Sequence, residues 1–238
     1  METPATQLKG RLAAVQRALD TAAAGAGRPP GSVHLMAVVK TQPAAHVSAA
    51  ADLGVRMFGE NRVQEGEARW AELPEDLRDR VRLHFIGRLQ ANKVRRALRL
   101  FDSLDSVDSP ILARRLSRIA EEEGLVREVM IEVNLGEESQ KGGVPPEEAG
   151  DLARLILDLP GLRLTGLMGV PPLGEDPEAS RPHFRRLADL FGRLRSFHPE
   201  PECMRWLSMG MSHDFPVAVQ EGSTLVRIGT ALFGPRRP

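Results

Sequence analysis

Eight short runs of strand-forming residues alternate along the chain with segments of helical pattern, and this alternation restricts the possible folds more than any other feature. Turn residues bound the runs, which cover 33–39, 55–59, 81–86, 101–107, 128–134, 162–170, 204–208 and 224–228. Such alternation predicts parallel strands joined by right-handed helical crossovers. Eight units in 238 residues favour a closed barrel over an open doubly wound sheet. We therefore predict an α/β protein with a (β/α)8 barrel of the TIM type.

The predicted helices carry apolar residues at spacings of three and four. The first helix, at about 5–25, has Leu8, Leu12, Val15 and Leu19 in this pattern and ends in a segment rich in glycine and proline. The helices between the strand-like runs are predicted at 44–53, 62–73, 92–100, 110–123, 147–159 and 182–197. The length suits one domain, so we expect residues 1–238 to form a single barrel domain with an N-terminal helix.

Charge and cysteine content narrow the possible partners and the cellular setting. Lysine plus arginine and aspartate plus glutamate both number 32, so no excess of basic charge points to nucleic acid or to an anionic membrane. The single cysteine, Cys203, cannot form an internal disulfide or a metal cluster, which favours a reducing cytoplasmic setting. The first ten residues contain Glu2 and Lys9 and no long apolar stretch, so we expect neither a signal peptide nor a membrane span.

Lys40 is the last residue of the apolar run that begins at His34, and the turn residues 41–43 follow it directly. A lysine at the end of a buried strand would have a partly desolvated ammonium, which lowers its pKa and frees its lone pair to attack a carbonyl. The alternative is a lysine whose ammonium simply reaches water at the end of the strand.

A second group of small and hydroxyl residues surrounds the seventh and eighth strand-like runs. Loops at this place in parallel barrels often bind phosphate through backbone N–H groups and hydroxyls, and Ser212, Gly229 and Thr230 suit that role. The glycines could equally form turns and the hydroxyls cap helices.

Arg227 lies between Val226 and Ile228 in an otherwise apolar run, so strand alternation directs its side chain into the barrel. A buried guanidinium needs an acceptor, which is either an internal carboxylate or a ligand. An activated amine, a phosphate site and an inward arginine are together explained by one cofactor, pyridoxal 5′-phosphate. Its aldehyde would meet Lys40, its phosphate the loops and its ring nitrogen Arg227.

Six segments in the right order resemble the pyridoxal phosphate homeostasis proteins. They are 37–41 (AVVKT), 58–65 (FGENRVQE), 84–93 (HFIGRLQANK), 166–170 (GLMGV), 208–214 (SMGMSHD) and 222–234 (GSTLVRIGTALFG). The resemblance implies a barrel of the alanine racemase N-terminal domain type, the type III fold of pyridoxal phosphate proteins. It also implies that Lys40 holds the cofactor as a Schiff base.

The same resemblance assigns roles to further residues. Arg227 would face the pyridine nitrogen, and the phosphate would be held by Ser212, Gly229 and Thr230, with Ser208 as a further candidate. Asn61 would lie near the ring. His84 would either line the cofactor or be a hydrogen-bonded core residue. Lys141 matches the lysine of the family's Ser-x-Lys-x-Gly loop and would be either a secondary acceptor during cofactor transfer or a surface lysine.

The chain contains no tyrosine, which bears on catalysis. Racemases of the related fold use the cofactor lysine and a tyrosine from another domain as two bases, and this sequence ends at Pro238 without a second domain. We therefore expect a non-catalytic protein for intracellular homeostasis that holds pyridoxal phosphate and supplies it to apo-enzymes, and we expect it to be a monomer. The alternatives are weak racemase-like or transaminase-like turnover of amino acids, with His84 as the nearest second base, and a Schiff-base aldolase for a sugar phosphate.

Overall fold

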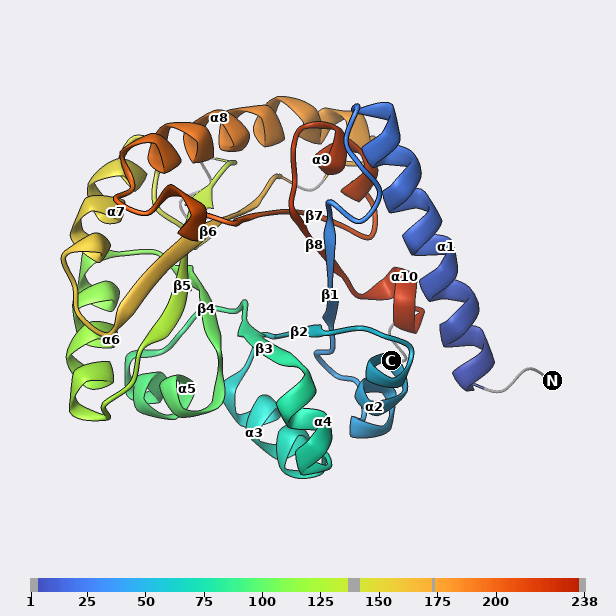
Figure 1. Cartoon of the computed structure of the whole chain (residues 1–238), viewed down its shortest axis with the longest axis horizontal. Coiled ribbons are helices and arrows are strands. Elements are labelled where there is room, and N and C mark those ends of the chain that lie inside the picture. The colour runs from blue at the N-terminus through green and yellow to red at the C-terminus, as the bar shows by residue number, and fades with distance from the viewer. Residues whose placement is uncertain (1–3, 137–141, 173, 236–238) are drawn as a thin grey trace.

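The computed structural model describes residues 4–136, 142–172 and 174–235, and it contains a closed barrel of eight parallel strands (Figure 1). The strands follow one another around the barrel in chain order, and the last pairs with the first. The predicted (β/α)8 barrel is therefore confirmed. The strands are β1 His34–Val38, β2 Met57–Glu60, β3 Arg82–Phe85, β4 Ser103–Val107, β5 Arg127–Asn134, β6 Leu162–Val170, β7 Trp206–Met211 and β8 Leu225–Ile228.

Helices cover the outside of the barrel. They are α1 Pro4–Gly25, α2 Ala44–Asp52, α3 Val63–Ala71, α4 Glu75–Arg80, α5 Val94–Leu100, α6 Pro110–Glu122, α7 Ala149–Leu157, α8 Arg181–Phe197, α9 Phe215–Gln220 and α10 Thr230–Phe233, with 3₁₀ turns η1 Ala91–Lys93, η2 Pro177–Ser180 and η3 Pro201–Cys203. No helix in the described part of the chain is both long and apolar enough to cross a membrane.

Helix α6 illustrates how the local sequence produces these elements. The Ser109 hydroxyl accepts a hydrogen bond from the Leu112 N–H at 3.3 Å, and Pro110 occupies the first turn, where its missing N–H costs nothing. Ala113 and Leu116 are then buried at a helical spacing. By contrast, the sequence pattern did not predict α4, α9 or α10, because helices of six, six and four residues are too short to show a period.

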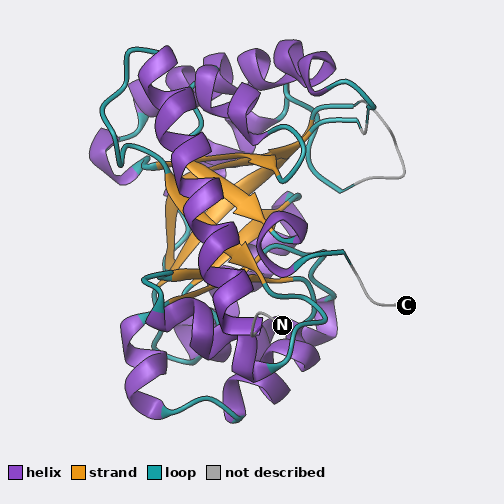
Figure 2. Cartoon of the chain, turned by 90° about the vertical axis from the view of Figure 1, so that its right-hand side faces the viewer, coloured by secondary structure: helices purple, strands orange, loops and turns teal. Residues whose placement is uncertain are grey.

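The first helix runs along the outside of the barrel, as Figure 2 shows, and packs against α9 and α10. Leu8, Val15 and Leu19 are buried in this contact region. Arg11 also donates a hydrogen bond to the Leu232 carbonyl in α10 at 3.4 Å. The N-terminal helix thus supports the segment that follows the last strand of the barrel.

The barrel interior contains both apolar and polar side chains. A small apolar cluster contains buried Met36, Met130, Trp206 and Leu225, each from a strand. The strands also contribute buried polar side chains, among them His84, Ser103, Asp105, Ser208 and Arg227. Sites of parallel barrels lie at the carboxyl ends of the strands, which is where Lys40, Asn61, Ser212 and Thr230 lie in this chain.

Candidate functional site

Lys40 lies two residues beyond the end of β1, in a turn and not at the end of a strand as the sequence suggested. The parallel ladder stops at Val38, which pairs with Gly59. The chain then turns, with the Gln42 N–H donating a hydrogen bond to the Val39 carbonyl at 2.9 Å. Lys40 is consequently half-buried at the mouth of the barrel.

The residue after Lys40 has an unusual backbone conformation. Thr41 has a φ of 64°, and it is the only residue other than glycine with a positive φ in the described ranges. This position of a turn normally takes glycine or asparagine, because a β-branched side chain in the left-handed region costs about 1–3 kcal/mol. The fold therefore holds the Lys40 turn in a conformation that its sequence does not favour.

Arg227 points into the barrel, as strand alternation predicted. Its hydrogen-bond acceptors are neither the internal carboxylate nor the ligand that the sequence suggested. The guanidinium is buried and donates hydrogen bonds to the Ser208 carbonyl at 2.7 Å, the Ser208 hydroxyl at 2.7 Å and the Gly169 carbonyl at 2.9 Å. Burial lowers the pKa of Arg227, while the carboxylates of Glu132, Asp105 and Asp214 oppose this shift. These bonds use three of the five guanidinium donors, which leaves capacity for a ligand.

The loops after β7 and β8 meet through Ser212. Its hydroxyl accepts a hydrogen bond at 3.2 Å from the N–H of Ala231 in α10, next to the predicted phosphate residues Gly229 and Thr230. Gly210, two residues earlier, lets β7 lie close to α9, because it has a φ of 92° and an added Cβ would lie 2.6 Å from the Cβ of Ala218. The structure thus brings three of the predicted phosphate residues together. Ser208, the fourth candidate, instead has its hydroxyl bonded to Arg227.

Asn61 follows β2 and borders a cavity of about 1130 Å³ formed by the loops after β2 and β3. The two loops approach so closely that a Cβ on Gly87 would lie 2.1 Å from the Asn61 carbonyl oxygen. The cavity is also lined by Arg62, Arg88, Lys93 and Glu65, and since Glu65 is paired with Arg62 at 3.1 Å, Arg88 and Lys93 give its wall an excess of positive charge.

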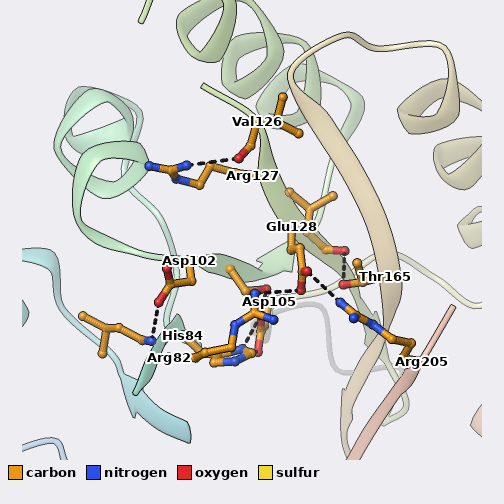
Figure 3. A network of polar contacts seen from close by, with 12 residues as sticks. Arg82, His84, Asp102, Asp105, Val126, Arg127, Glu128, Thr165 and Arg205 are labelled. Carbon is orange, nitrogen blue, oxygen red and sulfur yellow. Dashed lines mark hydrogen bonds and ion pairs between the residues drawn. The ribbon is translucent and has the colours of Figure 1, made fainter. Parts of the chain in front are cut away.

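His84 lies inside the barrel in a hydrogen-bonded network, shown with its surroundings in Figure 3. Its Nδ1 lies 2.9 Å from a carboxylate oxygen of Asp105, and Asp105 also accepts a hydrogen bond from the Ser103 hydroxyl at 2.5 Å. His84 Nε2 is buried without a hydrogen-bond partner among the described residues. The sequence left open whether His84 lines the cofactor or is a hydrogen-bonded core residue, and these contacts are those of a hydrogen-bonded core residue.

Farther toward the amino ends of the strands, Glu128 forms ion pairs with Arg82 at 3.0 Å and with Arg205 at 2.6 Å. Figure 3 shows these side chains in the same view as His84 and Asp105. This group of charges is therefore separate from Arg227, which lies farther along the strands toward Lys40.

The predicted site residues other than His84 and Lys141 therefore come from four strands that are adjacent in the barrel, or from the loops that follow them. Lys40 follows β1, Asn61 follows β2, Ser212 follows β7 and Thr230 follows β8. Lys141 lies outside the described residues. An amine, a guanidinium, hydroxyls and a short helix start are donors that suit a ligand with both a carbonyl and a phosphate group. No group of three or more His, Cys, Asp and Glu side chains in the described ranges could hold a metal ion.

Glu132 on β5 is a charged residue of this region that the sequence interpretation missed. Burial raises the pKa of its carboxyl to about 7, the positive charges of Arg227 and Arg88 oppose the shift, and the carboxylate of Asp108 reinforces it. The available signal was the alternation of polar residues along β5, where Glu128, Glu132 and Asn134 occupy every second or fourth position.

Replacing Glu132 with glutamine should change how stability depends on pH. The pKa of the folded carboxyl is about 7 and the ordinary pKa of a glutamate is 4.5, so the wild-type free energy of unfolding should fall as pH rises from about 4.5 through 7. Glu132→Gln removes this loss. The free energy of unfolding of the variant should equal that of the wild type at pH 4. Above pH 7 it should be higher by at most about 3 kcal/mol, because solvent screening reduces the effect.

Urea unfolding between pH 4 and 8.5 measures this difference. Glu121→Gln, at an exposed position of α6, is a control that should leave the pH dependence of the wild type unchanged. A stability difference between Glu132→Gln and the wild type that is constant across this range would contradict the prediction.

Comparison with known proteins identifies the family. The family model for the alanine racemase N-terminal domain matches residues 11–237. The pyridoxal phosphate homeostasis protein of Aquifex aeolicus is 41% identical over 227 residues, which cover 95% of this chain and 97% of that protein. This chain belongs to the family of pyridoxal phosphate homeostasis proteins.

Solved structures agree with membership of the pyridoxal phosphate homeostasis family. PipY of Synechococcus elongatus PCC7942, in a structure with pyridoxal phosphate bound, is 36% identical with a TM-score of 0.80, and the match covers 95% of this chain and all (100%) of PipY. Alanine racemase of Clostridium difficile 630 is 15% identical with a TM-score of 0.70, over 98% of this chain and 58% of the racemase. The second match concerns the fold alone, and with the family model it confirms the predicted barrel of the alanine racemase N-terminal domain type.

Proposed function

We propose that this protein binds pyridoxal 5′-phosphate as a Schiff base on Lys40, stores it and supplies it to apo-enzymes in the cytoplasm. The observation that supports this most is the position of the Lys40 turn, between β2 with Asn61 and the β8 and β7 loops with Thr230 and Ser212. The relative PipY has been solved with pyridoxal phosphate bound. We further propose that residues 1–238 act as one domain and as a monomer.

In this proposal the predicted residues divide the binding of the cofactor among them. Lys40 supplies the amine, and the phosphate is held by the Ser212 hydroxyl together with Gly229 and Thr230 at the start of α10. Arg227 faces the pyridine nitrogen, and Asn61 lies beside the ring. When bound, pyridoxal phosphate supplies an electrophilic aldehyde and an aromatic ring able to accept electrons.

Two observations favour a carrier over a racemase. Arg227 keeps its positive charge, so it disfavours a protonated pyridine nitrogen and weakens the ring as an electron acceptor. The chain has no tyrosine to act as a second base. His84, the nearest substitute suggested by the sequence, has no exposed surface, and its Nδ1 is held by Asp105.

Absorbance of the purified protein with pyridoxal phosphate, followed by borohydride reduction and peptide mapping, tests the attachment. We expect a Schiff-base band and a reduced pyridoxyl group on Lys40. The absence of both would exclude the cofactor and favour the aldolase alternative. The loaded protein should also activate an apo-enzyme whose free cofactor has been removed, and light scattering should give the mass of one chain.

Deuterium exchange at the α-carbon of a panel of amino acids distinguishes the carrier from the racemase-like enzyme. We expect no exchange at ordinary enzyme rates, which are roughly 1–1,000 per second. Exchange at such rates would reject a pure carrier. Exchange by free pyridoxal phosphate under the same conditions provides the baseline.

A further inference from the structure

The carbonyl of Gln42, the last residue of the Lys40 turn, is held by an arginine from another part of the chain. Arg69 on α3 donates a hydrogen bond from its Nε to this carbonyl at 2.5 Å. The same Gln42 closes the turn through its N–H, which bonds to the Val39 carbonyl. Arg69 therefore fixes one end of the short segment that contains Lys40 and Thr41.

Arg69 is itself held by a buried ion pair. Its Nη1 contacts Oε1 of Glu60, the last residue of β2, and the exposed fractions of the two side chains are 9% and 0%. A buried ion pair with a fixed strand at one end cannot easily change its geometry, because a displaced partner would leave an uncompensated charge. The Arg69 guanidinium thus links the end of β2, through Glu60, to the Lys40 turn, through the Gln42 carbonyl.

The side chain of Gln42 connects the same turn to the predicted phosphate region. Gln42 Oε1 lies 2.9 Å from Nδ1 of His46 on α2. The His46 ring is stacked on Phe233 of α10, with ring centroids 6.0 Å apart and an interplanar angle of 4°. The Lys40 turn is therefore attached to α3 on one side and to α10 on the other.

We propose that Arg69 is a positioning residue, which holds the strained Lys40–Thr41 turn so that the Lys40 amine meets a phosphate-anchored aldehyde. The positive φ of Thr41 is the reason why such support is needed, because the turn would otherwise relax toward negative φ. Arg69 does not touch the cofactor in this proposal. The inference rests on the proposed attachment at Lys40.

The double variant Glu60→Gln/Arg69→Met tests the proposal without leaving a buried charge unpaired. Methionine is long and flexible enough to fill the space, so the variant should fold with a cooperative thermal transition. Absorbance titration with pyridoxal phosphate should show the equilibrium constant for Schiff-base formation reduced about tenfold, which corresponds to about 1.4 kcal/mol. A folded variant with a constant within twofold of the wild type would overturn the proposal.

Adding Thr41→Gly to the double variant tests whether Arg69 acts through the turn. If Arg69 only stabilised the fold, this glycine would not restore the equilibrium constant for Schiff-base formation. Glycine adopts a positive φ without strain, so the turn should need less support, and at least a threefold recovery of the equilibrium constant is expected. No recovery would mean that Arg69 does not act through the turn.

Arg28→Met is the matched control, since Arg28 also donates to backbone carbonyls, those of Ser32, Val219 and Ser223, but does so away from the Lys40 turn. It should lower the unfolding temperature and leave the Schiff-base constant unchanged, whereas a tenfold loss of that constant would overturn the specific role of Arg69. If the wild type forms no Schiff base on Lys40, the proposed function itself fails, and this result is separate from all the variant results.

Discussion

Replacing Lys40 with alanine is expected to abolish the Schiff-base absorbance of the protein with pyridoxal phosphate. The side chain is half-buried in a turn beyond β1, so its removal should change the free energy of unfolding by only about 0.5 kcal/mol. The remaining contacts, from Arg227 and the β7 and β8 loops, would still bind the phosphate and ring without a covalent bond. Absorbance titration and borohydride reduction measure the first effect, and urea unfolding measures the second.

Lys93→Ala is the appropriate control for Lys40→Ala. Lys93 is also half-buried and lines the cavity beside Asn61, so its replacement removes the same charge near the same end of the barrel. The Schiff-base band should survive in this variant. Persistence of the band in Lys40→Ala would contradict the assignment and direct attention to another amine, with Lys141 as the first candidate from the sequence.

Replacing Arg227 with methionine should cost about 3–5 kcal/mol of unfolding free energy, the second large effect. The substitution leaves the Ser208 and Gly169 carbonyls without their donor. It also removes the positive charge that offsets Glu132, Asp105 and Asp214. Urea unfolding at pH 8.5 gives the free energy. The absorbance of added pyridoxal phosphate should shift as well, because the ring nitrogen loses its charged neighbour.

A double-mutant cycle separates the charge effect from the loss of hydrogen bonds. At pH 8.5, Glu132→Gln should stabilise the Arg227→Met variant more than it stabilises the wild type, with a coupling energy of about 0.5–3 kcal/mol. Arg28→Met, whose arginine also donates to backbone carbonyls, should show no such coupling with Glu132→Gln. Equal effects of Glu132→Gln in the wild-type and Arg227→Met backgrounds would contradict the proposed electrostatic interaction.

The barrel was predictable because its signal is repeated eight times. Each strand-like run contains enough β-branched and aliphatic residues to show its type, and the local pattern of a buried parallel strand does not depend on distant contacts. The inward direction of Arg227 followed from alternation alone. Lys40 was predicted at the end of the strand, whereas β1 ends at Val38 and Lys40 lies in the turn, because an apolar run does not show where its hydrogen-bond ladder ends.

Long-range contacts explain what the sequence did not show. Glu60 and Arg69 are nine positions apart on different elements, and nothing in their local pattern indicates that both are buried or that Arg69 reaches Gln42. Glu132 was missed for a similar reason, since its pKa is raised by burial, with Arg227 and Arg88 opposing the shift and Asp108 reinforcing it, and all three of these residues lie on other strands and loops. The positive φ of Thr41 was likewise not predictable, because residues 39–42 contain no glycine or asparagine that would indicate it.

The pairing of β8 with β1 has a consequence for when the protein can first act. Residue 40 is synthesised early, whereas residues 212–230 emerge from the ribosome only near the end. The two groups come together only where β8 pairs with β1 and closes the barrel. A nascent or truncated chain therefore has the amine without its phosphate partner. A ligand that binds only the folded state stabilises it by mass action. Bound pyridoxal phosphate should therefore also stabilise the pairing of β1 with β8.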